Sequence, residues 1–245
     1  MGPFAIIGNP VQSSMSPALF RAAYPQLPRD TYRTLEVPDA DTGWKEMLRL
    51  KIRGVNITMP FKADFIKFAQ YTETPVREIN ATNLVCIRDG RWTAFNTDVQ
   101  GVVNSFKECG MILKGKHVLI IGAGGAGRAA ALGMEQAGAL VYSANRTVRE
   151  GLYPLTSLPD LLKECSLVIN TIPWDSQQAL GTGFTAGHVI LDASYTEAPL
   201  KEAASRAGAL YLNGYNWLYH QAVEGFKIMT AAEPDKKAMR KFLGL

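Results

Sequence analysis

The amino-acid sequence predicts an α/β protein built from two domains. Apolar strand-like segments alternate with amphipathic helix-like segments through the first hundred residues, as in a sheet covered by helices. A second such series begins at Lys116 with a strand, a glycine-rich loop and an alanine-rich helix. A predicted helix from Asp98 to about Cys109 joins the two series. We therefore place an N-terminal α/β domain at residues 1–98 and a Rossmann-type domain at residues 99–218.

Composition restricts the class of protein. The chain has 245 residues, of which 47% are hydrophobic and 20% charged, so it can bury a substantial core. Its net charge of +4 comes from scattered Lys and Arg, which indicates attraction for small anions and not nucleic-acid binding. Three separated cysteines favour a reducing compartment and form no metal-binding pattern. With no signal-peptide pattern and no membrane-spanning apolar run, we expect a cytoplasmic location. We expect a monomer or a homodimer, without a sequence feature that selects between them.

The elements of the N-terminal series follow from residue periodicity and from turn residues. Pro17 opens the first helix, an aspartate caps the second, and Asp89-Gly90 is a two-residue turn typical of hairpins. In chain order we expect strands at 4–8, 31–37 and 54–59, helices at 17–25, 41–50 and 63–70, and a hairpin at 83–95.

The second series contains apolar strands of the kind that parallel sheets bury on both faces. Only residues 148–152 separate Thr147 from the next strand-like segment, too few for the usual crossover helix, so we predict a loop there. Two helices, at about 215–229 and 234–243, end the chain, and we expect residues 219–245 to pack back onto the N-terminal domain.

The glycine loop of the second domain favours binding of a dinucleotide. It reads Gly122-Ala123-Gly124-Gly125-Ala126-Gly127, between a strand and a helix. Gly122 and Gly124 permit a tight turn and close backbone approach, and Gly127 lets helix and strand pack closely. The helix N-terminus offers free N–H groups to a pyrophosphate. The alternative is a purely structural turn.

The end of the next strand bears on which dinucleotide binds. An NAD site usually places an acidic residue there, but this chain has Asn145, Arg146 and Thr147. A guanidinium suits a 2′-phosphate, so we predict NADP. The alternative is that Arg146 is an ordinary solvated loop residue.

Several polar residues of the N-terminal domain follow predicted strands. Ser14 and Ser16 precede a helix start, where they would hold a carboxylate or simply cap the helix. Asn83 stands at the mouth of the hairpin. Asp98 alone reads most simply as a helix cap. Lys62 comes soon after the strand in GVNITMPFK, residues 54–62.

Together these segments resemble the motifs of the shikimate dehydrogenase family. The matching segments, in order, are GNPVQSSMSP (8–17), GVNITMPFK (54–62), NATNLV (80–85), FNTDVQG (95–101), GAGGAGRA (122–129), NRT (145–147), DASY (192–195) and GYNWLYHQAVEGF (214–226). They cover nearly the whole chain. The resemblance implies NADPH-dependent, reversible reduction of 3-dehydroshikimate to shikimate, within aromatic amino-acid biosynthesis. It also implies two α/β domains separated by a deep cleft.

The resemblance implies a role for individual residues. Lys62 and Asp98 would form the catalytic pair, because an ammonium can stabilise the charge that hydride delivery builds on a ketone oxygen and can supply a proton. Asp98 would orient Lys62 and favour its charged form. The implied substrate ligands are Ser14, Ser16, Thr58, Asn83, Tyr195 and Gln221. The implied cofactor-binding residues are Gly122, Ala123, Gly124, Gly125, Ala126, Asn145, Arg146, Thr147, Ala193 and Gly214. No metal is implied.

Some positions depart from the family pattern, mostly on the nucleotide side. They are Ser13 for a histidine, Asn80 for a glycine, Ile172-Pro173-Trp174 for small polar residues, and Ala193 and Trp217 for methionines. Two alternatives therefore stay open: a quinate/shikimate dehydrogenase that uses NAD, and a non-catalytic relative that binds NADP or shikimate.

Overall fold

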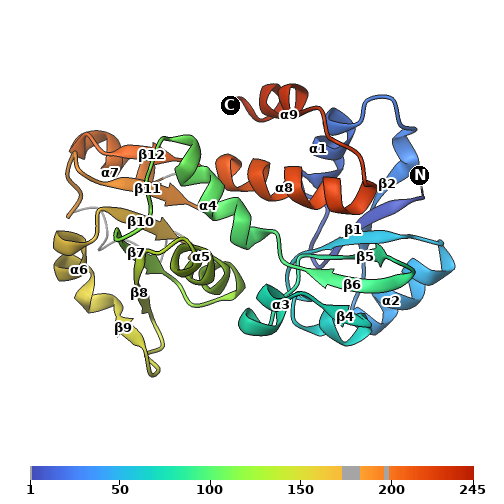
Figure 1. Cartoon of the computed structure of the whole chain (residues 1–245), viewed down its shortest axis with the longest axis horizontal. Helices are drawn as coiled ribbons and strands as arrows, with labels where there is room; N and C mark the ends of the chain where they lie inside the picture. The colour runs from blue at the N-terminus through green and yellow to red at the C-terminus, as the bar shows by residue number, and fades with distance from the viewer. Residues whose placement is uncertain (1, 173–182, 196–198) are drawn as a thin grey trace. The chain divides into compact units, whose positions relative to one another are not determined.

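Two structural units, each with its own sheet, divide the chain. The computed structural model describes residues 2–172, 183–195 and 199–245 (Figure 1). Unit 1 consists of Met1–Thr97 and Gln221–Leu245, and unit 2 of Asp98–His220. The two-domain α/β prediction is confirmed. Pro173 and Trp174, two of the departures from the family pattern, lie outside the described residues.

Unit 1 contains a mixed sheet with the strand order β2-β1-β3-β5-β6-β4. Strands β1, β2 and β3 are parallel, β5 pairs antiparallel with β3 and β6, and β4 runs parallel to β6. The strands are β1 (Phe4–Gly8), β2 (Tyr32–Glu36), β3 (Gly54–Ile57), β4 (Tyr71–Thr72), β5 (Leu84–Arg88) and β6 (Arg91–Phe95). The hairpin prediction is confirmed, and Asp89 and Gly90 both adopt positive φ, at 48° and 74°.

Unit 1 also contains several short helices. They are α1 (Ser16–Ala23), α2 (Ala40–Arg49), α3 (Thr74–Ile79) and α9 (Lys236–Leu243), with 3₁₀ turns η1 (Arg29–Thr31) and η2 (Asp64–Phe68). Asp39 caps α2, since its carboxylate accepts from the Thr42 N–H at 2.7 Å. Asn80, at the end of α3, has a left-handed φ of 48°. Asparagine tolerates this conformation better than most residues, which explains how it replaces the family's glycine.

The predicted helix at 63–70 is wrong in type and length. The structure has the 3₁₀ turn η2 there, and its C-cap Ala69 is already extended. The Gln70 N–H bonds to the Trp92 carbonyl at 2.8 Å, and β4 then pairs with β6. The chain must therefore leave the helix early to reach the sheet edge.

An aromatic cluster forms part of the core of unit 1. The Phe20 ring stacks on Tyr32 at 4.7 Å and meets Phe226 edge-on at 5.1 Å, between ring centroids. The end of α8 and helix α9 (red in Figure 1) contact α1, and the Asp235 N–H donates to the Ala23 carbonyl at 2.9 Å. The C-terminal segment is thus built into the core that supports α1.

Unit 2 contains a parallel sheet with the strand order β12-β11-β10-β7-β8-β9, a doubly wound Rossmann arrangement. Its strands are β7 (His117–Ile121), β8 (Leu140–Asn145), β9 (Leu152–Pro154), β10 (Leu167–Asn170), β11 (Val189–Asp192) and β12 (Leu210–Leu212). The helices that begin in unit 2 are α4 (Asp98–Glu108), α5 (Gly125–Gln136), α6 (Leu158–Glu164), η3 (Leu155–Ser157), α7 (Pro199–Ala207) and α8 (Gly214–Thr230).

Both faces of this sheet are buried. Along β7, Val118 and Ile120 belong to one apolar cluster, and Leu119 and Ile121 belong to a second. The unbroken apolar run of β7 follows from this arrangement, because neither face of the strand meets water.

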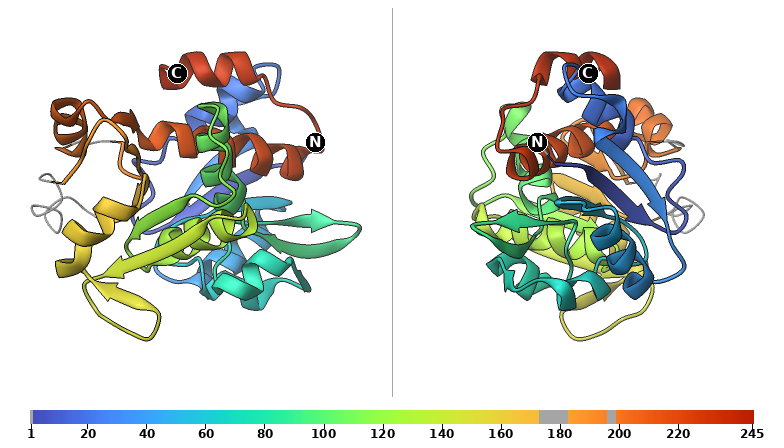
Figure 2. Two further views of the ribbon diagram at one scale, coloured as in Figure 1. Left: turned by 60° about the vertical axis from the view of Figure 1, so that its left-hand side comes forward. Right: turned by 90° about the vertical axis from the view of Figure 1, so that its right-hand side faces the viewer.

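The second crossover is a loop, as predicted. Strand β9 pairs only with the end of β8, from Ser143 opposite Leu152 to Asn145 opposite Pro154. The chain therefore turns back by only a few residues before it pairs again, and no helix is needed to cross the sheet. The loop at residues 146–151 extends away from the strands, at the bottom of both views in Figure 2.

Two cysteine thiols lie in the cores of the two units. Cys86 is on β5 of unit 1, and Cys165 follows α6 in unit 2. Burial raises the pKa of the Cys86 thiol to about 12 and that of Cys165 to about 11. Both thiols are therefore protonated near neutral pH.

A membrane-spanning helix is absent from the part of the chain that the structure describes, because no helix there combines the required length with an apolar sequence.

Replacement of Phe20 tests the aromatic cluster. Phe20 is 2% exposed, so Phe20→Ala should leave a cavity and lower the free energy of unfolding by about 3–5 kcal/mol. Phe242→Ala is the matched control, because that ring is 41% exposed and its loss should cost about 1 kcal/mol or less. Urea denaturation followed by circular dichroism measures both. Equal losses in the two variants would contradict the assignment of Phe20 to the core.

Candidate functional site

A buried polar cluster stands at the end of the β5–β6 hairpin in unit 1. The Asn83 Nδ2 donates to Thr97 Oγ1 at 2.9 Å, and the Thr97 N–H donates to Asn83 Oδ1 at 2.9 Å. The Gln221 Oε1 accepts from both Asn83 Nδ2 and Thr97 Oγ1, each at 3.4 Å. Two predicted ligands, Asn83 and Gln221, are thus brought together although 138 positions separate them in the sequence. Thr97, which links them, stands in the segment FNTDVQG but was not predicted as a site residue.

The loop after β3 carries Thr58 and Lys62 next to this cluster. The Thr58 N–H bonds to the Ile7 carbonyl at 2.9 Å, which continues the parallel pairing one step beyond β3. Phe61 is buried and anchors the loop. The Lys62 carbonyl accepts from the Thr82 N–H at 2.8 Å, so the backbone of Lys62 is fixed beside the residue that precedes Asn83. The backbone of Lys62 is therefore held just beyond the carboxyl end of an apolar strand, next to the polar cluster.

The two predicted serines stand at the start of α1. Met15 is the N-cap of α1 and makes no side-chain capping bond, and Ser16 is the first helical residue. The Ser16 N–H donates to Ser14 Oγ at 3.2 Å. The simple alternative that a serine caps this helix therefore fails for Ser16. The Ser14 hydroxyl thus lies beside the first N–H group of the helix, at an end that favours an anion.

The glycine loop of unit 2 has the geometry of a dinucleotide cradle. Gly122 has φ +106°, and a Cβ at Gly127 would lie 1.9 Å from the Gly122 carbonyl oxygen, so neither position admits a side chain. A Cβ at Gly124 would meet nothing within 4 Å, which leaves the loop open above α5. The Arg128 guanidinium donates to the Ala123 carbonyl at 3.1 Å. Sequence reasoning did not single out this cation.

The end of β8 presents a cation and no acid. The Asn145 Nδ2 donates to the Thr147 carbonyl at 3.1 Å and closes a tight turn. Arg146 and Thr147 are exposed. The open loop, the helix N-terminus and an exposed guanidinium beside them fit a dinucleotide with a 2′-phosphate.

A buried carboxylate organises the segment after β11. Asp192 is 1% exposed and accepts from Asn170 Nδ2 at 2.9 Å, from the Ser194 N–H at 3.1 Å and from the Tyr211 hydroxyl at 3.2 Å. Burial raises the pKa of Asp192, against the opposing effect of these donors. Asp192 is part of the segment DASY, but this structural role was not predicted from the sequence.

The same segment brings Ala193 and Gly214 together. The Gly214 N–H donates to the Ser194 carbonyl at 3.2 Å, and a Cβ at Gly214 would lie 2.5 Å from the Ala193 carbonyl oxygen. Tyr195 stacks on Tyr215 with centroids 5.2 Å apart, and burial raises the pKa of its phenol. Tyr195 belongs to unit 2, whereas the other predicted substrate ligands belong to unit 1.

Asp98 is the first residue of α4, and a tryptophan holds its backbone. The Trp217 Nε1 donates to the Asp98 carbonyl at 2.9 Å. Trp217 is one of the departures from the family pattern and is otherwise buried among apolar side chains. A buried indole N–H needs a hydrogen-bond acceptor. A tryptophan at a core position was therefore the one signal in the sequence that could have predicted this bond.

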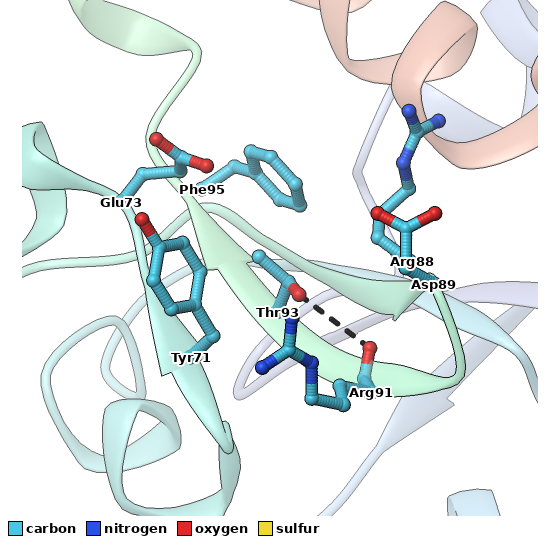
Figure 3. Close-up of a pocket in the computed structure, with 7 residues that line it drawn as sticks. All are labelled: Tyr71, Glu73, Arg88, Asp89, Arg91, Thr93 and Phe95. Atoms are coloured by element: carbon cyan, nitrogen blue, oxygen red, sulfur yellow. Dashed lines mark hydrogen bonds between the residues drawn. The ribbon is translucent and has the colours of Figure 1, made fainter.

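A separate cavity of about 210 Å³ lies beside the hairpin turn of unit 1. Figure 3 shows acidic and basic side chains around it, and the Thr93 hydroxyl donates to the Arg91 carbonyl at 3.4 Å. Its lining residues are Tyr71, Glu73, Arg88, Asp89, Arg91, Thr93 and Phe95. None of the predicted site residues lines it.

Asp192→Asn tests the buried carboxylate through pH. Because the pKa of Asp192 is raised in the folded protein, folding is favoured by its proton, and this contribution is lost as pH rises through the raised pKa. As the pH rises above about 4, the melting temperature of the wild type should therefore fall relative to that of Asp192→Asn. Calorimetric scans across this range measure the difference. Parallel pH profiles would contradict a raised pKa.

The comparisons with known proteins agree on one family. Residues 6–85 match the model of the shikimate dehydrogenase substrate binding domain. A shikimate dehydrogenase (NADP(+)) from Carboxydothermus hydrogenoformans is 32% identical, over 98% of this chain and 95% of that protein.

Two solved structures are also similar. The Aquifex aeolicus shikimate dehydrogenase has a TM-score of 0.89 at 28% identity, covering 98% of this chain and 97% of that one. The Thermus thermophilus shikimate 5-dehydrogenase in complex with NADP(H) and shikimate has a TM-score of 0.86 at 27% identity, covering 100% and 99%. On this full-length similarity, the chain belongs to the shikimate dehydrogenase family.

Proposed function

We propose that this protein is an NADP-dependent shikimate dehydrogenase, which reduces 3-dehydroshikimate to shikimate reversibly. The observation that carries the proposal is the cluster of the buried Asn83 and Thr97 with the half-buried Gln221, next to the loop that holds Lys62. The two hydrogen bonds to Gln221 are long, at 3.4 Å each. Hydrogen bonds to the hydroxyl groups of a bound ring can replace them. The relatives that share the whole chain are named as NADP(+)-dependent shikimate dehydrogenases, which supports the same conclusion.

Each group of the substrate has a proposed partner. Ser14 and Ser16 would hold the carboxylate at the start of α1, with Tyr195 as a further donor. Thr58, Asn83 and Gln221 would bind the ring hydroxyls. Residues 1–98 with the C-terminal helices would thus form the substrate domain, and residues 99–218 the cofactor domain.

Lys62 and Asp98 would carry the chemistry. As the ketone is reduced, negative charge grows on its oxygen, and the Lys62 ammonium would stabilise that charge and give the oxygen a proton. Asp98 would orient the ammonium and bind the neighbouring hydroxyl. Asp98 follows Thr97 directly in the chain. The two hydrogen bonds between Thr97 and Asn83 therefore hold the backbone that leads into Asp98.

The residues that we propose to bind the cofactor are arranged in a way that suits NADP. Bound NADPH would supply the hydride. Gly122, Ala123, Gly124, Gly125 and Ala126 would cradle the pyrophosphate at the N-terminus of α5. Arg146, between Asn145 and Thr147, would pair with the 2′-phosphate, while Ala193 and Gly214 would line the nicotinamide end. The cytoplasmic location and the monomeric or homodimeric state stay predictions.

Turnover of defined substrate pairs tests the function. We expect oxidation of shikimate with NADP⁺, followed by nicotinamide absorbance, and a fall in kcat/KM of about 10²- to 10⁴-fold in Lys62→Ala. Lys67→Ala is the matched control, because Lys67 is exposed and paired with Asp41, and its activity should stay within about twofold of wild type. Turnover of quinate with NAD⁺ in place of shikimate with NADP⁺ would favour the alternative dehydrogenase. Binding without turnover would favour the non-catalytic relative.

Arg146→Ala tests the choice of cofactor. Loss of a charge-assisted bond to the 2′-phosphate should raise the KM for NADP⁺ by about 10- to 100-fold and leave the KM for NAD⁺ nearly unchanged. The control is Arg149→Ala in the same exposed loop, which should leave both values as in wild type. If Arg146→Ala kept its preference for NADP⁺, another group would have to bind the phosphate.

A further inference from the structure

Glu36 is an exposed acid whose carboxylate binds the backbone of the loop that contains Ser14. It is the last residue of β2 and pairs in register with Gly8, the last residue of β1. Residues 9–15 connect β1 to α1, and we call this segment the serine loop. The Glu36 Oε2 accepts from the Val11 N–H in this loop at 3.1 Å. A side chain of one strand therefore holds the loop that follows its neighbour.

Hydrogen bonds within the loop connect Val11 to both predicted serines. The Ser14 N–H donates to the Val11 carbonyl at 3.1 Å and closes a turn over residues 11–14. The Ser14 Oγ then accepts from the Ser16 N–H at 3.2 Å, at the start of α1. A continuous path of hydrogen bonds therefore runs from Glu36 through Val11 and Ser14 to the first helical residue.

The beginning of the serine loop is held from both sides of β1. Strand β1 lies between β2 and β3 in the sheet. Toward β3, the Asn9 N–H donates to the Met59 carbonyl at 2.9 Å, and Gly8 lies so close to Thr58 that a Cβ would clash with that side chain. Toward β2, the corresponding bond is the one from Val11 to Glu36. The Glu36 carboxylate thus supplies the hold that this side of the loop requires.

Loss of the carboxylate would leave the Val11 N–H without this acceptor. Val11 is 1% exposed, so water has little access to it, and a buried N–H without a partner is costly. The turn that carries Ser14 would shift to relieve that cost. Glu36 is itself an anion and would repel a carboxylate, so it can favour binding of a carboxylate only through the loop and not by direct contact.

We propose that Glu36 is a positioning residue, which fixes the serine loop so that Ser14 and the start of α1 are placed to bind the carboxylate of the substrate. This inference rests on the proposed function, because it takes Ser14 and Ser16 to be carboxylate ligands. A loop that is already ordered lowers the cost of ordering the site when substrate binds. Glu36 lies outside every segment that resembles a family motif.

Glu36→Ala removes the acceptor. The dissociation constant and the KM for shikimate should rise about 3- to 30-fold, because the serine loop is no longer fixed. The kcat and the KM for NADP⁺ should stay within about twofold of wild type, because Lys62 and the glycine loop are unchanged. Calorimetric titration with shikimate and steady-state kinetics measure these values.

Glu36→Gln separates the hydrogen bond from the charge. The amide oxygen of glutamine can still accept from the Val11 N–H, but the negative charge is gone. The affinity for shikimate should therefore return to within about twofold of wild type or exceed it. A loss as large as that of Glu36→Ala would mean that the bond to Val11 is not what matters, and would overturn the proposal.

Asp39→Ala is the matched control for loss of an exposed carboxylate that accepts a backbone N–H. Asp39 caps α2 through the Thr42 N–H at 2.7 Å. This variant should lose thermal stability and keep the wild-type affinity for shikimate. Equal loss of affinity in Asp39→Ala and Glu36→Ala would reduce Glu36 to a general role in stability.

A double variant tests whether Glu36 acts through Ser14. Ser14→Ala/Glu36→Ala should bind shikimate nearly as well as Ser14→Ala alone, because a displaced serine loop matters little once its hydroxyl is gone. A loss equal to the product of the two single losses would contradict transmission through Ser14.

The remaining outcomes separate the two proposals. Wild-type turnover of shikimate with an unchanged dissociation constant in Glu36→Ala would overturn the role of Glu36 and leave the proposed function standing. A wild-type protein that neither binds nor turns over shikimate would overturn both.

Discussion

The polar residues of unit 1 depend on the position of one residue, Asn83. Its carbonyl accepts from the Ile57 N–H at 2.9 Å and so joins the hairpin to the end of β3. Its side-chain amide bonds Thr97, where unit 1 ends, and Gln221, where the C-terminal segment of unit 1 begins. A buried amide must satisfy all of its donors and acceptors, so these segments can meet in few other ways. The sheet thereby fixes a polar centre through these hydrogen bonds.

Much of this arrangement could be predicted from the sequence, because periodicity and glycine placement are local properties. Alternation predicted β3, Asp89-Gly90 predicted the hairpin, and the small number of residues after Thr147 predicted the loop crossover. The two-residue strand β4 and helix α3 were missed, since two residues show no alternation and β4 exists only through its pairing with β6. The helix at 63–70 was wrong for the same reason, because tertiary pairing ended it early.

Residues that act through other residues were harder to predict than the motif positions. Thr97 and Trp217 act through hydrogen bonds to Gln221 and Asp98, which are distant from them in the sequence. In the sequence alone they look like a cap residue and a core residue. Glu36 looks like an ordinary solvated position at the end of a strand. What distinguishes each of them is a hydrogen bond to another segment of the chain, which becomes visible only when its partner is known.

The two core cysteines give each unit its own chemical reporter. Because Cys86 and Cys165 are buried and protonated, thiol reagents can modify them only when the surrounding structure opens. Cys86 reports opening of unit 1 and Cys165 opening of unit 2. Timed alkylation followed by peptide mass spectrometry would therefore resolve whether the two units unfold together or one at a time, with no engineered label in the protein.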